Sequence, residues 1–237
     1  MRILYVFPHP DDESFGPGPA MSKQRREGYE VYLLTLTKGG ATRQRFKYGH
    51  SIEEMGEVRC QEMQDVAKVL DLSGMEILDF PDSGLKEADP RELEESVREE
   101  IERRKPQVVV TYPVHGISGF HDHLITHAVV KRVFVAMKES SSYLRRLAFH
   151  TILEEQAQGS KHFRLSSSTS QEIDCVFEVD PEDVENGRRA LDCYVTFQET
   201  IEKTGIRDHL SSQVAFEFFQ EEYDPPVGDV FEGITPS

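Results

Sequence analysis

A histidine and three carboxylates stand close together near the start of the chain. His9, Asp11, Asp12 and Glu13 come directly after residues 3–6, an apolar run that predicts a short buried strand ended by the flanking prolines. Neutral imidazole and carboxylate groups form a ligand set that suits zinc, and a carboxylate beside the ligands is placed to deprotonate a metal-bound water. The same acids could instead do no more than stabilise the start of a helix. The loop therefore predicts half of a metal site, with the helix terminus as the simpler alternative.

A second group of histidines lies far along the chain. His115, His121, His123 and His127 follow residues 107–112, an apolar run that predicts another buried strand. Two ligands from the first loop and one from the second would make a three-ligand site with a position left for water, which is the pattern of catalytic zinc. His127, one helical turn beyond His123, could be only a satisfied polar residue. The presence of two clusters favours a metal centre over isolated polar side chains.

The predicted elements bring the two clusters together. Strands are predicted over 3–6, 31–36, 75–80 and 107–112, and helices over 20–27, 51–70, 90–105 and after His123. This alternation predicts an α/β domain with a Rossmann-like, mostly parallel sheet flanked by helices on both faces. In the common strand order 3-2-1-4 the first and fourth strands are neighbours, and ligands bind beyond their carboxyl ends. Both clusters follow those ends.

The second half of the chain has weaker patterns. Strands are expected over 147–153 and 173–179, a loop over 159–171, a helix from Pro181 to about Phe197, and covering segments over 216–219 and 224–231. Residues 43–50 are polar with two aromatics and predict a mobile loop over the site. We expect a single domain over residues 1–237, in which 1–135 carry the metal-site motifs and 136–237 form a C-terminal half.

Charge and hydropathy narrow the class of protein. The chain has 237 residues and a formal net charge of -16, with 43 Asp and Glu against 27 Lys and Arg. Such a surface repels phosphate backbones and anionic headgroups, which argues against nucleic-acid and membrane partners. The N-terminus has no charged segment followed by a long apolar stretch, and no apolar run approaches membrane-spanning length. We therefore expect a cytoplasmic protein.

Other kinds of site have little support. Cys60, Cys175 and Cys193 form no Cys-x-x-Cys pair, so neither a disulfide framework nor a thiolate zinc site is predicted. No Gly-x-Gly-x-x-Gly follows the first strand, and the chain has no Walker loop and no Gly-x-Ser-x-Gly elbow. Dinucleotide binding, Walker-type phosphate binding and serine hydrolysis are therefore disfavoured.

Four motifs resemble the LmbE/PIG-L family. They are Pro8–Glu13, Gly119–His123, Pro81–Gly84 and the pair Arg59 and Glu62. Enzymes of this family are zinc-dependent deacetylases that remove an N-acetyl group from N-acetylglucosamine-containing small molecules or lipids. The resemblance covers residues 1–130 well and the remainder loosely. It implies a metal-dependent hydrolase with one zinc ion per chain, although other divalent metals accept the same ligands.

The resemblance also implies roles for individual residues. It makes His9, Asp12 and His123 the zinc ligands and Asp11 the general base. In such a site zinc activates a water molecule and Asp11 takes its proton as the water attacks the acetyl carbonyl. The same proton could then return to the leaving amide nitrogen.

One position departs from the family pattern. The second motif commonly reads His-x-Asp-His, whereas here Phe120 stands at the first His and His121 follows it. The missing His helps to stabilise the tetrahedral intermediate in the family. His121 could take over this catalytic role, and His115 or Tyr112 are alternatives. His121 could also replace His123 as the ligand.

Two further residues match family positions that meet sugar hydroxyls. The resemblance implies that Arg59 and Asp82 bind substrate, whereas their simpler readings are a surface helix pair and a turn-forming Asp. The expected partner is a small GlcNAc-type molecule, and a homo-oligomer is compatible with the sequence. Two rival functions stay open: a zinc amidase acting on a larger amide of a glucosamine-based thiol conjugate, and a metal- or sugar-binding protein without turnover.

Overall fold

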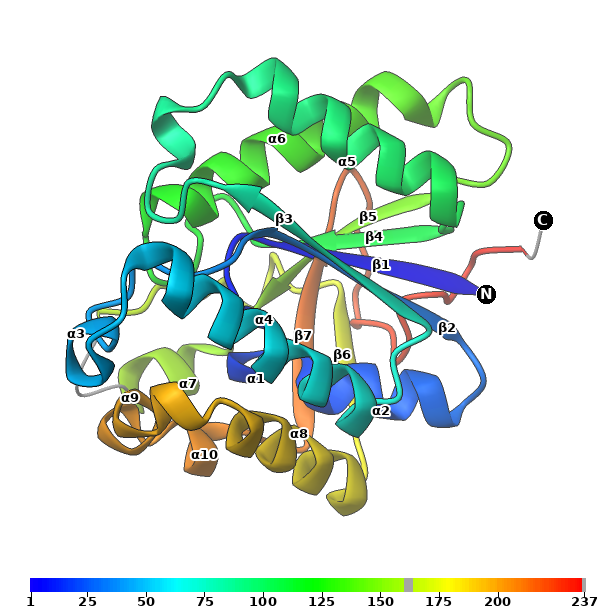
Figure 1. Ribbon diagram of the computed structural model, residues 1–237. Helices are drawn as coiled ribbons and strands as arrows, with labels where there is room; N and C mark the ends of the chain where they lie inside the picture. Colours follow the sequence, from blue (N-terminus) through cyan, green and yellow to red (C-terminus); the bar gives the residue numbers. More distant parts are fainter. Residues whose placement is uncertain (160–163, 236–237) are drawn as a thin grey trace.

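The computed structural model describes residues 1–159 and 164–235 (Figure 1). Within these residues seven strands form one sheet in the order β3-β2-β1-β4-β5-β7-β6. The strands are β1 (Arg2–Phe7), β2 (Glu30–Thr37), β3 (Gly74–Phe80), β4 (Val108–Thr111), β5 (Arg146–Thr151), β6 (Cys175–Glu178) and β7 (Gln213–Phe218). The first five strands in this order are parallel, and β7 runs antiparallel to both β5 and β6. The predicted Rossmann-like sheet and its strand order are confirmed.

Helices cover both faces of the sheet (Figure 1). They are α1 (Asp12–Phe15), α2 (Gly18–Arg26), α3 (Arg45–Tyr48), α4 (Ile52–Val69), α5 (Pro90–Arg104), α6 (His121–Lys138), α7 (Glu154–Gly159), α8 (Pro181–Cys193), α9 (Gln198–Thr204) and α10 (Ile206–His209), with 3-10 turns η1 (Leu85–Glu87) and η2 (Val195–Phe197). Helices α5 and α6 cover one face, and α2, α4 and α8 cover the other. None of the helices in the described ranges is both long and apolar enough to cross a membrane.

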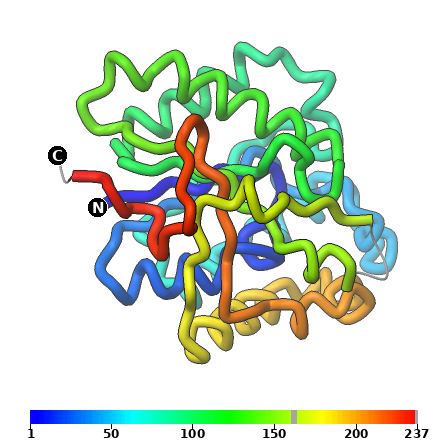
Figure 2. Tube along the Cα trace, turned by 180° about the vertical axis from the view of Figure 1, so that it is seen from behind, coloured from blue at the N-terminus to red at the C-terminus, as the bar shows by residue number. Residues whose placement is uncertain are grey.

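Strand β1 lies at the centre because both of its faces are buried. Ile3 and Tyr5 pack into the core under α2, α4 and α8, while Leu4 and Val6 pack under α5 and α6. A strand buried on both sides reads as a continuous apolar run. Its neighbours are β2 and β4, so the loops after β1 and β4 leave the sheet side by side. The N-terminus lies at the opposite end of the strands, and the described part of the C-terminal tail runs toward the same side (Figures 1 and 2).

Several expected elements differ in the structure. The segment 216–219, expected to cover the domain, belongs to strand β7, which pairs with two neighbours inside the sheet. The helix expected to reach Phe197 ends at Cys193, because Tyr194 leaves the helical conformation with ψ at 68°. The loop expected over 43–50 contains the short helix α3. Part of the loop expected over 159–171, residues 160–163, lies outside the described residues.

Candidate active site

The loop after β1 holds Asp11 in a strained conformation. Its φ is 94° and its ψ is -25°, in a region that residues other than glycine rarely occupy. Tyr194 Oη accepts from the backbone N–H of Asp11 at 2.8 Å. Arg59 Nη2 donates to Asp11 Oδ2 at 2.8 Å and to the carbonyl oxygen of Pro10 at 2.6 Å. These contacts fix both the backbone and the carboxylate, as expected where strain serves a site.

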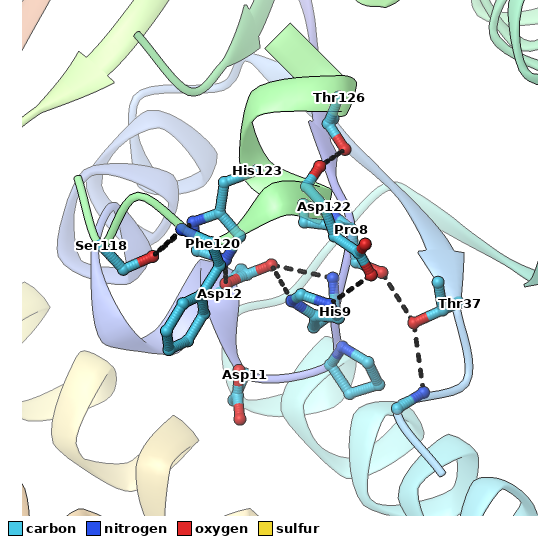
Figure 3. Close-up of polar contacts among 12 residues, drawn as sticks. Pro8, His9, Asp11, Asp12, Thr37, Ser118, Phe120, Asp122, His123 and Thr126 are labelled. Atoms are coloured by element: carbon cyan, nitrogen blue, oxygen red, sulfur yellow. Dashed lines mark hydrogen bonds and ion pairs between the residues drawn. The ribbon is translucent and has the colours of Figure 1, made fainter. Parts of the chain in front are cut away.

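Three predicted ligands converge beyond the carboxyl ends of β1 and β4. One ligand atom each of His9, Asp12 and His123 lies within 4.8 Å of the others, and Figure 3 shows the side chains pointing toward one another. The Oδ2 atom of Asp12 is 3.6 Å from His9 Nδ1, and its Oδ1 atom is 3.4 Å from His123 Nε2. The fold thus brings together residues from two loops that are far apart in the sequence.

Hydrogen bonds on the far side of each ring orient the two histidines. His123 Nδ1 is 2.9 Å from the carbonyl oxygen of Gly116, and His9 Nε2 is 3.1 Å from Asp122 Oδ2. Donation of these N–H groups leaves His9 Nδ1 and His123 Nε2 with lone pairs on the side of Asp12. Asp122 is therefore the acceptor that steadies His9, and its other oxygen accepts from the backbone of Leu85 at 3.2 Å.

The carboxylate of Asp12 is held as firmly as the two rings. Tyr112 Oη donates to its Oδ1 atom at 2.7 Å, and the backbone N–H of His9 donates to its Oδ2 atom at 2.8 Å. The ring of Tyr112 also stacks on His123, with centroids 4.1 Å apart and planes 9° apart. Two neutral imidazole nitrogens and one oriented carboxylate are a donor set that suits zinc.

Burial and charge shift the acidities of this cluster. Burial raises the pKa of Asp11 to about 7, although the Arg59 guanidinium opposes the shift. Burial lowers the pKa of His9, but the hydrogen bond to Asp122 and the charge of Asp12 outweigh it, so the pKa without a bound cation is raised to about 9, and a metal would replace the proton on Nδ1. Burial also lowers the pKa of His123. Asp11 is therefore suited to exchange a proton near neutral pH.

Asp82 and Arg59, the two predicted substrate-binding residues, both lie at the cluster. Asp82 Oδ1 is 3.4 Å from His9 Nε2, and Asp82 Oδ2 accepts from the backbone of Ala41 at 2.7 Å. Arg59 is only 2% exposed, so it is not half of a surface pair. Its expected helical neighbour Glu62 instead accepts from Thr196 N at 2.7 Å and from Thr196 Oγ1 at 2.8 Å.

The structure does not bring His121 into the site. His121 is exposed at the first position of α6 and is absent from the described residues that line the cavity. Two residues on a helix that are two positions apart point about 200° away from each other. Since His123 faces the cluster, His121 faces outward.

The other candidate histidines are engaged elsewhere. His115 accepts from the backbone of Ile117 at 3.1 Å, and His127 Nδ1 bonds the carbonyl oxygen of Tyr112 at 2.8 Å. No sequence motif pointed to His150, whose side chain lines the same cavity as the cluster. Residues 189–198 resemble a family segment of the pocket wall that usually has His where Tyr194 stands, but they did not predict that Tyr194 Oη would donate to Glu13 Oε1 of the first loop at 2.7 Å.

The cluster opens into a cavity of about 380 Å³. Its lining includes all three predicted ligands together with Asp11, Arg59 and Asp82, and it continues along residues of α9, α10 and β7. A concave site of this size that contains titratable groups with shifted pKa values is the expected location of catalysis.

The family of the chain follows from the sequence over its first half. Residues 4–134 match the profile of the PIG-L family, described as GlcNAc-PI de-N-acetylase. The chain belongs to the PIG-L family. The resemblance expected from the sequence motifs is confirmed, and the matched residues contain every position placed at the cluster apart from Tyr194 and His150.

Two curated relatives agree with this membership. Mycothiol S-conjugate amidase of Streptomyces coelicolor is 31% identical over 161 residues, covering 60% of this chain and 55% of the amidase. The 1D-myo-inositol 2-acetamido-2-deoxy-alpha-D-glucopyranoside deacetylase of Thermomonospora curvata is 35% identical over 152 residues, covering 55% of this chain and 51% of the deacetylase. The chain thus aligns with about half the length of these two relatives.

The fold is shared with enzymes of different chemistry. A deacetylase of teicoplanin biosynthesis aligns with a TM-score of 0.72 and 16% identity, covering 93% of this chain and 99% of that one. A 4-carboxy-2-hydroxymuconate hydratase of Pseudomonas putida aligns with a TM-score of 0.65 and 12% identity, covering 100% and 98%. At these identities the likeness establishes the fold, and the reaction must be argued from the site.

Proposed function

We propose that this PIG-L family chain is a zinc-dependent hydrolase that removes the N-acetyl group from a small molecule containing N-acetylglucosamine. The observation that carries the proposal is the convergence of His9, Asp12 and His123 beside the buried carboxylate of Asp11. The deacetylase relative supports the choice of substrate class. The two relatives align with this chain over about half of their length, so the activity of the whole chain is part of the proposal.

The donor set fits a single catalytic zinc ion. His9 Nδ1, one Asp12 oxygen and His123 Nε2 would hold the metal, which when bound supplies a Lewis acid that polarises the amide carbonyl and acidifies water. The remaining contacts serve orientation: Asp122 and Gly116 fix the rings, and Tyr112 fixes the carboxylate. The stacked Tyr112 ring also shields one face of His123 from water.

Asp11 is the residue that moves the proton. Its Oδ2 atom accepts from Arg59 and the residue lines the cavity, so Oδ1 is the oxygen that Arg59 does not engage. Oδ1 can therefore accept a proton from the attacking water and return it to the amide nitrogen as the C–N bond breaks. Arg59 keeps the carboxylate in place, and its own buried Nε lacks a partner among the described residues, so it can donate to the substrate.

A larger amide is the second candidate substrate. The Streptomyces coelicolor relative is an amidase of a mycothiol S-conjugate, and the cavity extends well past the cluster along α9, α10 and β7. The proposed proton transfer is the same for either amide. One structural neighbour is a hydratase. A hydration reaction would instead add water across a carbon–carbon double bond and release no amine.

Free-amine release distinguishes these reactions. We would treat the protein with a chelator, restore zinc, and measure primary amine from N-acetylglucosamine, from chitobiose-type substrates and from GlcNAc glycosides. The proposal expects amine release that is lost with the metal and regained with zinc. Release from none of these substrates by protein with bound zinc would overturn it in favour of the larger amide or of a binding protein.

A further inference from the structure

The cavity has a second part that the metal cluster does not use. Beyond the cluster the wall includes a group of apolar side chains from the first loop and from the C-terminal half, beside uncharged polar residues. We name this part the apolar chamber, and its defining residues are Phe15, Pro19, Phe197, Ile206, Leu210 and Val214. These residues line the same continuous cavity as His9, Asp12 and His123. A group attached to the reacting carbonyl can therefore reach the chamber directly.

Close contacts between distant segments build the chamber. Gly16 packs so closely on His150 that a Cβ atom at position 16 would collide with the imidazole. Gly187 of α8 lies between Pro19 and Leu210, since its Cβ position is 2.8 Å from Pro19 Cγ and 3.3 Å from Leu210 Cδ1. These contacts fix the part of the chamber wall formed by Pro19 and Leu210.

An aromatic pair of the chamber lies next to Arg59. Phe15 and Phe197 meet edge to face with centroids 6.2 Å apart, and the Arg59 guanidinium lies 4.5 Å from the ring centroid of Phe197. Because Arg59 bonds Asp11, this chain of contacts leads from the proton-transfer residue to the chamber.

The chamber carries no permanent charge. Among the described lining residues from 150 to 215 there is no Asp, Glu, Lys or Arg. Burial lowers the pKa of His150 to about 3, so its imidazole is neutral at physiological pH. Asp82, Ser83 and Thr42 line the cavity from the loops after β2 and β3. The lining from the C-terminal half is uncharged and combines the apolar residues of the chamber with hydroxyl and amide groups such as those of Thr200 and Gln213. The charged lining is therefore confined to the side of the metal cluster, and hydrocarbon can be bound only in the chamber.

We infer that the apolar chamber binds the acyl part of the amide, and that the preferred substrates carry an uncharged, apolar N-acyl group longer than acetyl on a hydroxylated amine. This inference rests on the proposed amide hydrolysis at the cluster. Water supplies its oxygen to the acyl carbon as the C–N bond breaks, giving a carboxylic acid in the chamber and a free amine on the side of the metal cluster. An acetyl group alone would leave most of the chamber unfilled.

Two substrates of matched size test which side of the amide enters the chamber. N-octanoylglucosamine carries its hydrocarbon on the acyl side, whereas octyl N-acetylglucosaminide carries it on the sugar. With zinc-loaded protein we expect kcat/KM for N-octanoylglucosamine to exceed that for N-acetylglucosamine by at least about tenfold, since one methylene in an apolar pocket is worth about tenfold or more. A preference for the octyl glycoside, or no gain from the longer acyl group, would overturn the inference.

A blocking variant tests the chamber itself. Thr204 lines the cavity at the end of α9 and is half-buried, so Thr204→Trp places a large side chain in the cavity. Glu202→Trp is the control, because Glu202 is an exposed residue of the same helix and is absent from the described cavity lining. We expect Thr204→Trp to remove most of the gain for the octanoyl amide and to change N-acetylglucosamine hydrolysis little. Glu202→Trp should retain the gain. Equal loss in both variants, or no loss in Thr204→Trp, would contradict the assignment.

Binding without turnover separates this inference from the proposed function. Calorimetry on the zinc-loaded Asp11→Asn variant should show tighter binding of N-octanoylglucosamine than of N-acetylglucosamine, with a more negative heat-capacity change because apolar surface is buried. Failure of the proposed function would appear as no amine release from any of the N-acetyl substrates by the unaltered protein with bound zinc. Failure of the chamber assignment would appear as equal affinity for the two amides.

Discussion

At the scale of single residues, the proposed chemistry depends on hydrogen bonds that orient the side chains of the cluster. His9 and His123 each have one ring nitrogen bonded to an oxygen, and Asp12 has both oxygens occupied by donors. Such partners set the tautomer and orientation of a metal ligand. Tyr194 likewise restrains Asp11, because Tyr194 Oη accepts from the backbone N–H of Asp11.

Replacing the Tyr194 hydroxyl tests this support. Tyr194→Phe removes the acceptor of Asp11 N–H and the donor to the buried Glu13, so we expect a loss of about 1–3 kcal/mol in the free energy of unfolding. Amine release should also fall, because Asp11 loses one restraint. Chemical denaturation and rate measurements check both. Tyr29→Phe, which loses one bond to the partly exposed Asp229, is the matched control and should cost less and leave the rate unchanged.

The sequence could predict that His9, Asp12 and His123 would come together, but not the side of the helix on which each residue lies. The motif contained two histidines, and only the start of α6 at His121 decides that His123 faces inward. If α6 were turned by one residue, about 100°, a different side chain would face the cluster. Tyr194 is remote from Asp11 in the sequence, and no local pattern indicates a contact that the packing of α8 creates.

At the scale of elements, the loop between β4 and α6 sets the position of His123. Gly116 and Gly119 both adopt positive φ, 62° and 69°, so a side chain at either position is strained. They differ in space: a Cβ at Gly116 would lie 2.9 Å from His123 Cβ, whereas a Cβ at Gly119 meets nothing within 4 Å. Only Gly116 gives room for the ligand.

This difference provides a matched pair of variants. Gly116→Ala and Gly119→Ala should both destabilise the fold by about 1 kcal/mol through the left-handed backbone. Only Gly116→Ala should displace His123, and we expect it to weaken zinc binding by about 10–100-fold, the effect typical of losing ligand support. Competition titration with a chromogenic chelator measures the affinity. Equal zinc affinity in the two variants would show that Gly116 does not position His123.

The elements that the sequence predicted well are those with strong local patterns. Strands β1, β2 and β4 are apolar runs because they are buried, and α4 begins at Ser51 with the expected capping box to Glu54. Strand β7 was missed because only residues 216–219 stood out and their pairing with β5 and β6 is a long-range choice. Tertiary pairing of this kind leaves little trace in a local window.

At the scale of the whole molecule, the two halves of the chain share one core. Ile3 and Tyr5 from the first half pack in the same cluster as Leu191 and Phe216 from the second. The sheet likewise continues from β4 into β5, β7 and β6. The single-domain organisation expected from the sequence stays a prediction, and this shared core supports it.

Dissection of the chain tests that organisation. A fragment of residues 1–135 would lose β5, β6, β7 and α8 and would expose the β4 edge and half of a core cluster. We expect it to show no cooperative thermal transition by circular dichroism, in contrast to the full chain, and to bind a hydrophobic dye. A cooperative transition of the fragment would show that the metal-site half is a domain of its own.

The most direct test of the central claim is the Asp11→Asn variant, with zinc content and amine release measured on the same sample. Asn tolerates positive φ, so the loop should keep its shape while the proton acceptor is lost. We predict that Asp11→Asn retains zinc and that its kcat/KM falls by about 10²–10⁴-fold. Asp12→Ala should lose zinc as well as activity. An Asp11→Asn protein that keeps its rate, or that loses its zinc, would contradict the role given to Asp11.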